Sequence, residues 1–341
     1  MTIIIYCGIY ILTTVLAISP RAISGRFFFL SWFFVMVCLS LSSRLGFVYS
    51  PESDYGAYAM NMAITDYILP YHYREFVFWL GSRFLYGVLG DPNLVFVVMD
   101  LVLFIAFYNA LKLLATIFDK DIDTANLRYL FFGAFLCLPY VIGFNNSYRQ
   151  LLAMCIFLNS LAYVRTKPKL SFFIFLISFF THNVVAILAP FLILIRNKSN
   201  SYLFAFLAPV AISFVLIFVM SSDNAVINRS GGVEIGKRIA WIYLFALIFI
   251  AVIFSSIEFY RSTRAKTKQS ILGGILLFGT LMYFIGFMVL PSQTSERMFF
   301  AIFTVLYLLL GVYLESHFRT SYLVRLLYAQ LASLPLLYLV I

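Results

Sequence analysis

Residues 145–195 decide the fold class, and they read NNSYRQLLAMCIFLNSLAYVRTKPKLSFFIFLISFFTHNVVAILAPFLILI. Two apolar runs, 149–164 and 171–195, lie on either side of a basic turn at 165–169. A run of roughly 20 apolar residues is the length that an α-helix needs to cross a hydrocarbon core of about 30 Å. Neither run alternates polar and apolar residues as a membrane strand does. We therefore predict helices that cross or enter a membrane.

The composition of the whole chain supports the same class. Of its 341 residues, 63% are hydrophobic and only 11% are charged, which excludes an ordinary soluble domain. We predict an all-α fold, a single polytopic membrane bundle over residues 1–341 with about 10–11 transmembrane helices. The spans are expected at 3–19, 27–48, 93–117, 127–144, 149–164, 202–221, 239–257, 271–290, 298–314 and 321–340.

The orientation of the chain depends on whether residues 171–195 cross the membrane. If they do, the 24 Lys and Arg residues divide evenly between the two sides, and the enrichment of basic residues in cytoplasmic loops gives no answer. If they form a re-entrant helical hairpin, broken at Thr181-His182-Asn183, most of the basic residues fall on one side. We favour the hairpin, which has to be buried in protein or line a wet cavity.

This topology places the long polar loop 49–92 on the outer, periplasmic face, together with the turn before Arg149 and the turn 291–297. Within the loop, residues 75–89 are predicted to form an interfacial helix. The net charge of +10 is then the excess of cytoplasmic Lys and Arg, and we expect no nucleic-acid partner. The cysteines lie inside apolar runs without metal-ligand spacing, and we expect neither a metal nor a cofactor.

Two arginines are candidates for binding an anion. Arg149 lies in the first turn of a predicted helix that Asn146 or Ser147 can cap, and Arg297 lies in the first turns of another helix from the same face. A helix N-terminus offers unpaired N–H groups, and a guanidinium adds a two-pronged donor, so the two ends suit a diphosphate. The alternative is that each arginine extends to lipid headgroups.

His182 and the acids of the outer loop are candidates for proton transfer. An imidazole at membrane depth is costly unless it is partnered, so His182 is either a site residue or a packed histidine bonded to a neighbouring carbonyl. The loop interleaves acids with aromatic residues, a mixture that suits carbohydrate. Asp54 and Glu75 are the predicted general bases, whereas Asp100, inside a span, is as well explained by pairing within the bundle.

These motifs, taken in order, resemble the EpsG/Wzy family of bacterial O-antigen and exopolysaccharide polymerases over roughly residues 45–310. They are Asp54-Tyr55 with Tyr58, Glu75 before an aromatic helix, Tyr148 to Ala153 opening a span, Phe179 to Asn183, and Glu296-Arg297-Met298. The resemblance implies an enzyme of the bacterial inner membrane with its active site facing the periplasm. It also implies undecaprenyl-diphosphate-linked glycans as donor and acceptor, and a chain-length regulator protein as a partner.

For the site, the resemblance implies that Arg149 and Arg297 hold the leaving diphosphate, that His182 positions donor or base, and that Asp54 or Glu75 is the base. The remaining predicted substrate-binding residues are Tyr55, Tyr148, Gln150, Asn183 and Glu296. Two other classes stay open. One is a different polyprenyl-phosphate-dependent membrane glycosyltransferase; the other is a flippase of lipid-linked oligosaccharides, for which the sequence lacks a second broken helix in a related half.

Overall fold

The computed structural model describes residues 2–45, 53–64, 70–118, 124–145, 147–196, 207–209, 211, 277–282, 284, 292–317 and 322–340. These described residues are about 91% helical and include no strand, which confirms the all-α prediction. The chain divides into two compact units, one made of Met1–Val185 with Tyr307–Ile341 and the other of Ala186–Leu306. Each unit is described by itself, and the single domain stays a prediction.

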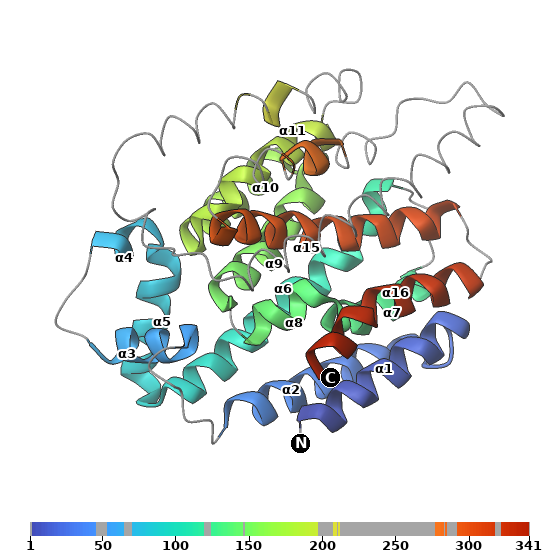
Figure 1. Ribbon diagram of the computed structural model, residues 1–341, viewed down its shortest axis with the longest axis horizontal. Coiled ribbons are helices and arrows are strands. Elements are labelled where there is room, and N and C mark those ends of the chain that lie inside the picture. The colour runs from blue at the N-terminus through green and yellow to red at the C-terminus, as the bar shows by residue number, and fades with distance from the viewer. Residues whose placement is uncertain are drawn as a thin grey trace. The chain divides into compact units, whose positions relative to one another are not determined.

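The first unit holds most of the described helices. They are α1 Thr2–Ile18, α2 Gly25–Arg44, α3 Asp54–Ala63, α4 Pro70–Arg74, α5 Phe76–Leu89, α6 Pro92–Phe118, α7 Arg128–Gly133, α8 Leu138–Asn145, α9 Tyr148–Tyr163, α10 Pro168–Thr181 and α16 Tyr322–Val340, with the 3₁₀ turns Thr124–Leu127 and Ala134–Leu136 (Figure 1). The 3₁₀ turn Asn183–Leu188 and α15 Ser292–His317 belong partly to each unit, and α11 Ala189–Arg196 belongs to the second.

Helix α9 forms the centre of the first unit and packs mainly against α6 and α10. It is apolar on all sides, and almost all of its residues are buried, as expected for a helix surrounded by others. Small hydroxyl residues join it to α10: Ser160 Oγ donates to Ser171 O at 2.7 Å, and Ser178 Oγ donates to Ala153 O at 2.7 Å. Such contacts draw membrane helices together.

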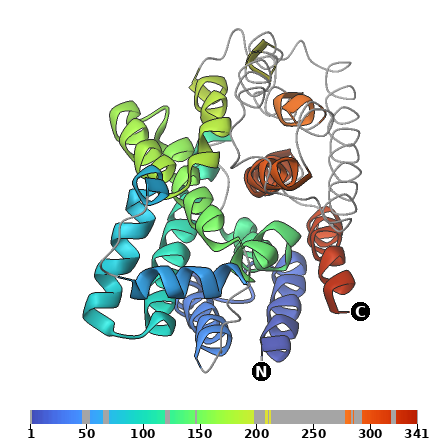
Figure 2. The ribbon, with the colours of Figure 1, turned by 60° about the vertical axis from the view of Figure 1, so that its left-hand side comes forward.

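The described residues of the predicted loop 49–92 include three helices, α3, α4 and α5. Figures 1 and 2 show α3 and α5 beside the N-terminal half of α6, with α4 at the start of α5. Helix α5 contacts both α6 and α10. The predicted helix over 75–89 is confirmed as α5, which ends at Gly90, a residue with φ of 69° in the left-handed region that favours glycine. Helix α5 therefore spans the distance between the start of α6 and the end of α10.

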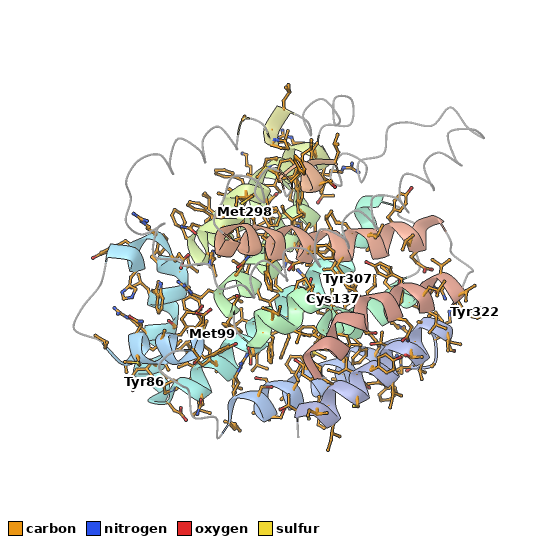
Figure 3. The ribbon with its side chains drawn as sticks, viewed as in Figure 1. Tyr86, Met99, Cys137, Met298, Tyr307 and Tyr322 are labelled. Carbon is orange, nitrogen blue, oxygen red and sulfur yellow. The ribbon has the colours of Figure 1, made fainter. Side chains whose placement is uncertain are left out.

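The run 127–144, predicted as one span, is divided into α7, a 3₁₀ turn and α8. The backbone is extended at Cys137, just before α8, and Pro139 lies in the first turn of that helix. Proline has no N–H to donate and clashes with the preceding turn, so it begins a helix and does not continue one. Figure 3 labels Cys137 close to Tyr307, which packs against Tyr140 of α8.

Within the described residues, α2 and residues Pro92–Leu114 of α6 are long and apolar enough to cross a membrane by length and composition. The predicted spans 202–221, 239–257 and 271–290 lie largely outside the described residues. The predicted break at Thr181-His182-Asn183 is present, because α10 ends at Thr181 and a 3₁₀ turn begins at Asn183. The two arms of the hairpin belong to different units, and the hairpin itself stays a prediction.

Candidate active site

Glu75 joins the separated elements of the candidate site. It occupies the N-cap position of α5 without capping that helix, and it is only 7% exposed. One carboxylate oxygen, Oε2, accepts a hydrogen bond from Nη1 of Arg149. The other, Oε1, lies 3.6 Å from Nδ1 of His182. The acid, the arginine and the histidine that the sequence singled out therefore lie together, although they come from α5, α9 and the end of α10.

Arg149 is held among aromatic rings. Its guanidinium carbon lies 4.9 Å from the ring centroid of Tyr58, 5.1 Å from that of Trp79 and 5.7 Å from that of Phe78. The face of an aromatic ring attracts a cation, and the packing restricts the long side chain to few conformations. The Nε atom of Arg149 is buried and has no hydrogen-bond partner among the described residues. The hydrogen-bonding capacity of Arg149 is therefore not fully used, and part of its side chain is exposed.

The N-terminus of α9 adds backbone donors next to this guanidinium. Ser147 occupies the N-cap position, and its carbonyl accepts from the N–H groups of Gln150 and Leu151 at 3.1 Å. Its side chain makes no capping hydrogen bond, and Asn146, the other predicted cap, lies outside the described residues. The first N–H groups of a helix have no partner within the helix, so this end favours an anion.

His182 is the residue at which α10 stops. Its backbone is extended, with φ of −156° and ψ of 121°, and the side chain turns towards Glu75. The backbone N–H of Val184 donates to Nδ1 of His182 at 3.2 Å, a bond that the neutral ring accepts when its proton is on Nε2. A proton bound at Nδ1 would instead face the Glu75 carboxylate. Nδ1 of His182 can therefore accept from the N–H of Val184 in the neutral ring and donate to the Glu75 carboxylate after it gains a proton.

The other predicted site residues outside the aromatic pair Tyr55 and Tyr148 lie on α3, on α9, just beyond the end of α10 and on α15. Asp54 begins α3, is half-buried and lies within electrostatic reach of Arg149. Gln150 is buried in the first turn of α9, and Asn183 is exposed beyond the break. Glu296 and Arg297 belong to the first turns of α15, a helix that starts at Ser292 as expected, but their side chains lie outside the described set.

Tyr55 and Tyr148, predicted to bind substrate, lie behind the site and not on its surface. Both are buried, with their ring centroids 5.8 Å apart, and they pack against Arg44. Arg44 Nε donates to Asp100 Oδ2 at 3.0 Å, and Arg44 Nη2 donates to the Phe144 carbonyl at 2.8 Å. Asp100 follows Met99, which is labelled on α6 in Figure 3.

The sequence interpretation named Asp100 as a residue that could pair within the bundle, but it missed Arg44 as the partner. Ser40 Oγ also donates to Asp100 Oδ2, at 2.6 Å. A signal was present: Arg44 lies one helical turn after Ser40 in an otherwise apolar run, and a charge at membrane depth needs a partner. Together these residues form a second, more deeply buried ion pair behind the first.

His72 was also missed. It lies on α4, is 2% exposed, and its ring centroid is 4.7 Å from that of Trp79, one of the rings around Arg149. Burial, with the charges of Arg83 and Arg149, lowers the pKa of His72 below its ordinary value. Its position between Pro70 and Arg74 in a polar loop gave no periodic pattern from which burial could be predicted.

The arrangement can bind an anion and accept a proton within one cluster. Arg149 and the start of α9 supply positive charge and donors, and Glu75 supplies a carboxylate whose position is fixed on one side by Arg149 and on the other by His182. In the described part of the chain, no group of three or more His, Cys, Asp or Glu side chains is arranged to hold a metal ion.

Comparison with protein-family models gives one match. The model of the EpsG family matches residues 31–340 of the chain, a range that includes every residue of the cluster. Neither the curated proteins nor the solved structures compared with the chain give a match.

Proposed function

The chain belongs to the EpsG family, and from that membership and the cluster around Glu75 we propose that it is a polysaccharide polymerase of the bacterial inner membrane. The family and the apolar helices together make it a membrane protein of polysaccharide biosynthesis. The finer proposal is that it joins undecaprenyl-diphosphate-linked oligosaccharide repeat units at the periplasmic face. The observation that supports this most is the meeting of Arg149, Glu75 and His182.

The proposed reaction is a glycosyl transfer between two lipid-linked glycans. An acceptor hydroxyl oxygen forms a bond to the anomeric carbon of the donor, and the bond from that carbon to the diphosphate oxygen breaks. The hydroxyl proton passes to Glu75, while the diphosphate leaves as an anion. Because diphosphate is already a good leaving group, the protein has to orient the two substrates and stabilise charge.

Arg149 suits the stabilising role because a guanidinium has five N–H donors and Glu75 occupies only one side of it. The exposed part of the guanidinium and the first N–H groups of α9 remain for the diphosphate oxygens. Glu75 suits the role of base because its carboxylate is held between Arg149 and His182 and cannot turn away. A proton that arrives on Glu75 can be shared with Nδ1 of His182.

The test is a reconstituted reaction with no nucleotide sugar. The purified protein is incubated in detergent with the undecaprenyl-diphosphate repeat unit of its host, and the products are separated on a gel. We expect a ladder of polymers that disappears in Arg149→Ala and in Glu75→Gln. Arg74→Ala is the matched control, because Arg74 is exposed and directly precedes Glu75.

Three results would count against the proposal. A ladder that persists unchanged in both variants would show that polymerisation does not depend on this cluster. Absence of any ladder, combined with protein-dependent movement of the same lipid across vesicle membranes, would favour the flippase instead. Transfer of a single sugar from a polyprenyl phosphate would favour a different glycosyltransferase.

A further inference from the structure

An apolar groove lies on the first unit away from the candidate active site. It has a volume of about 840 Å³ and runs between α6, α9 and α10. Its walls are almost entirely apolar, with Val102 and Ile105 on α6, Ile156 and Tyr163 on α9, and Ile174 and Ile177 on α10. The groove starts about two turns along α9 from Arg149 and reaches the last residue of that helix, Tyr163. A chain of methylene groups fits such a surface.

Basic residues lie at the far end of this groove. Lys167 is exposed in the turn between α9 and α10, Lys169 is exposed in the first turn of α10, and the ammonium of Lys167 lies 5.9 Å from the ring centroid of Tyr163. Lys112 is exposed on α6, one turn beyond Asn109, which lines the groove, so the two residues share a face of the helix. The three ammonium groups are thus available for an anion at the membrane surface.

Two polar side chains, Asn109 and Asn159, lie between the lysines and the apolar walls of the groove. Asn159, four residues before Tyr163, donates to the carbonyls of Ala106 at 2.8 Å and Cys155 at 2.9 Å, and accepts from Asn109 at 2.8 Å. These hydrogen bonds use both N–H donors of Asn159. Asn109 is exposed, and a second N–H and its carbonyl oxygen have no partner among the described residues. Its partner Asn159 lies about 6 Å along α9 from Tyr163, at 1.5 Å of rise per residue.

We propose that this groove binds an anionic phospholipid from the leaflet opposite the active site. Its phosphate contacts Lys112, Lys167 and Lys169, an ester carbonyl accepts from Asn109, and an acyl chain lies along the apolar walls. Helix α9 has 16 residues, so its two ends are about 24 Å apart, and the groove mouth and Arg149 belong to opposite membrane faces. The inference does not depend on the proposed function, because it concerns a resident lipid and not a substrate.

Native mass spectrometry of the full-length protein tests this directly. The protein is released from detergent in the presence of phosphatidylglycerol or phosphatidylcholine, and the bound lipid is counted. We expect phosphatidylglycerol to be retained about tenfold more than phosphatidylcholine, since each basic residue near a membrane attracts anionic lipid. The variant Lys112→Gln/Lys167→Gln/Lys169→Gln should lose this preference.

A control removes the same charge elsewhere. Arg21, Arg74 and Arg196 are exposed and lie more than one helical turn from any residue that lines the groove, so the variant Arg21→Gln/Arg74→Gln/Arg196→Gln should keep the preference. Ala106→Phe places a ring in the groove and should reduce retention of both lipids, with the thermal midpoint showing that the variant folds. Equal loss in both charge variants would overturn the proposal. So would retention that Ala106→Phe leaves unchanged, or retention of a polyprenyl phosphate alone.

Discussion

Two arginine–carboxylate pairs lie close together in this protein, and they differ in how completely their hydrogen bonds are used. In the Arg44–Asp100 pair the side chains are 3% and 0% exposed; in the Arg149–Glu75 pair they are 20% and 9% exposed. Arg44 contacts both oxygens of Asp100 and a backbone carbonyl. Arg149 contacts one oxygen of Glu75 and retains a donor without a partner.

The same two helices, α3 and α9, contact both pairs. In α3, Tyr55 lies over Arg44 and Tyr58, one turn later, lies over Arg149. In α9, Tyr148 packs against the first pair and its neighbour Arg149 belongs to the second. We call Arg44–Asp100 the saturated pair and Arg149–Glu75 the open pair. The saturated pair helps to fix the positions of α3 and α9, on which the open pair depends. We infer that Arg44–Asp100 has a structural role and that Arg149–Glu75 has a chemical one.

The largest expected effect is on stability, from breaking the saturated pair. Arg44→Ala leaves the Asp100 carboxylate buried without its cation, which costs about 3–5 kcal/mol of folding free energy. The measurement is the thermal midpoint and the folded yield in detergent. Adding Asp100→Asn to the same chain removes the unpaired charge and should restore part of the loss. An Arg44→Ala protein as stable as the parent would show that this pair is not structural.

The next effect is on activity, from breaking the open pair. Arg149→Ala should lower the polymerisation rate about hundredfold, the usual result of removing one donor that stabilises a transition-state anion. Stability should fall by less than in Arg44→Ala, because the Arg149–Glu75 pair is less deeply buried than the Arg44–Asp100 pair and Glu75 keeps His182 as a neighbour. Arg149→Lys keeps the charge without the forked donors and should recover only part of the rate. Equal losses of stability in Arg149→Ala and Arg44→Ala would remove the distinction between the pairs.

Sequence patterns singled out both residues of the Arg149–Glu75 pair, but only Asp100 of the Arg44–Asp100 pair. Arg149 was indicated by the start of a predicted helix, Glu75 by the acids of the outer loop, and His182 by its place in an apolar run, where a polar side chain is expensive. Their mutual contacts could not be predicted, because they depend on how α5, in the loop, packs against α6 and α10. The division of 127–144 could have been predicted from Pro139, whose missing N–H begins a helix.

The third effect concerns the histidine that only the open pair has. His182→Gln should lower the turnover about fivefold, because one contact of this kind is worth about 1 kcal/mol and each 1.4 kcal/mol changes a rate tenfold. The KM for the lipid-linked donor should stay unchanged, since His182 contacts Glu75 and the donor is proposed to bind Arg149. Asn183→Ala, at the exposed neighbouring position, is the control. A raised KM with normal turnover would make His182 a binding residue instead.

The smallest expected effect tests whether the charge of Arg149 contributes to the lowered pKa of the neighbouring His72. Burial, with Arg83 and Arg149, lowers the pKa of His72 below its ordinary value of 6.5, so the folded protein resists protonation of this ring. The unfolded chain binds that proton more readily, and stability therefore falls as the pH drops below about 6.5. Thermal midpoints at pH 7.5 and pH 5.5 should show this loss of stability in the parent and less of it in His72→Gln.

Arg149→Ala should also reduce this loss of stability, because it removes one of the two cations that repel a protonated His72. Arg44, whose charge is neutralised by Asp100, is not one of these two cations. If Arg149→Ala keeps the full loss that His72→Gln removes, burial and Arg83 alone govern this ring. The charge of Arg149 in the open pair would then affect neighbouring ionisable groups as little as the charge of Arg44 in the saturated pair.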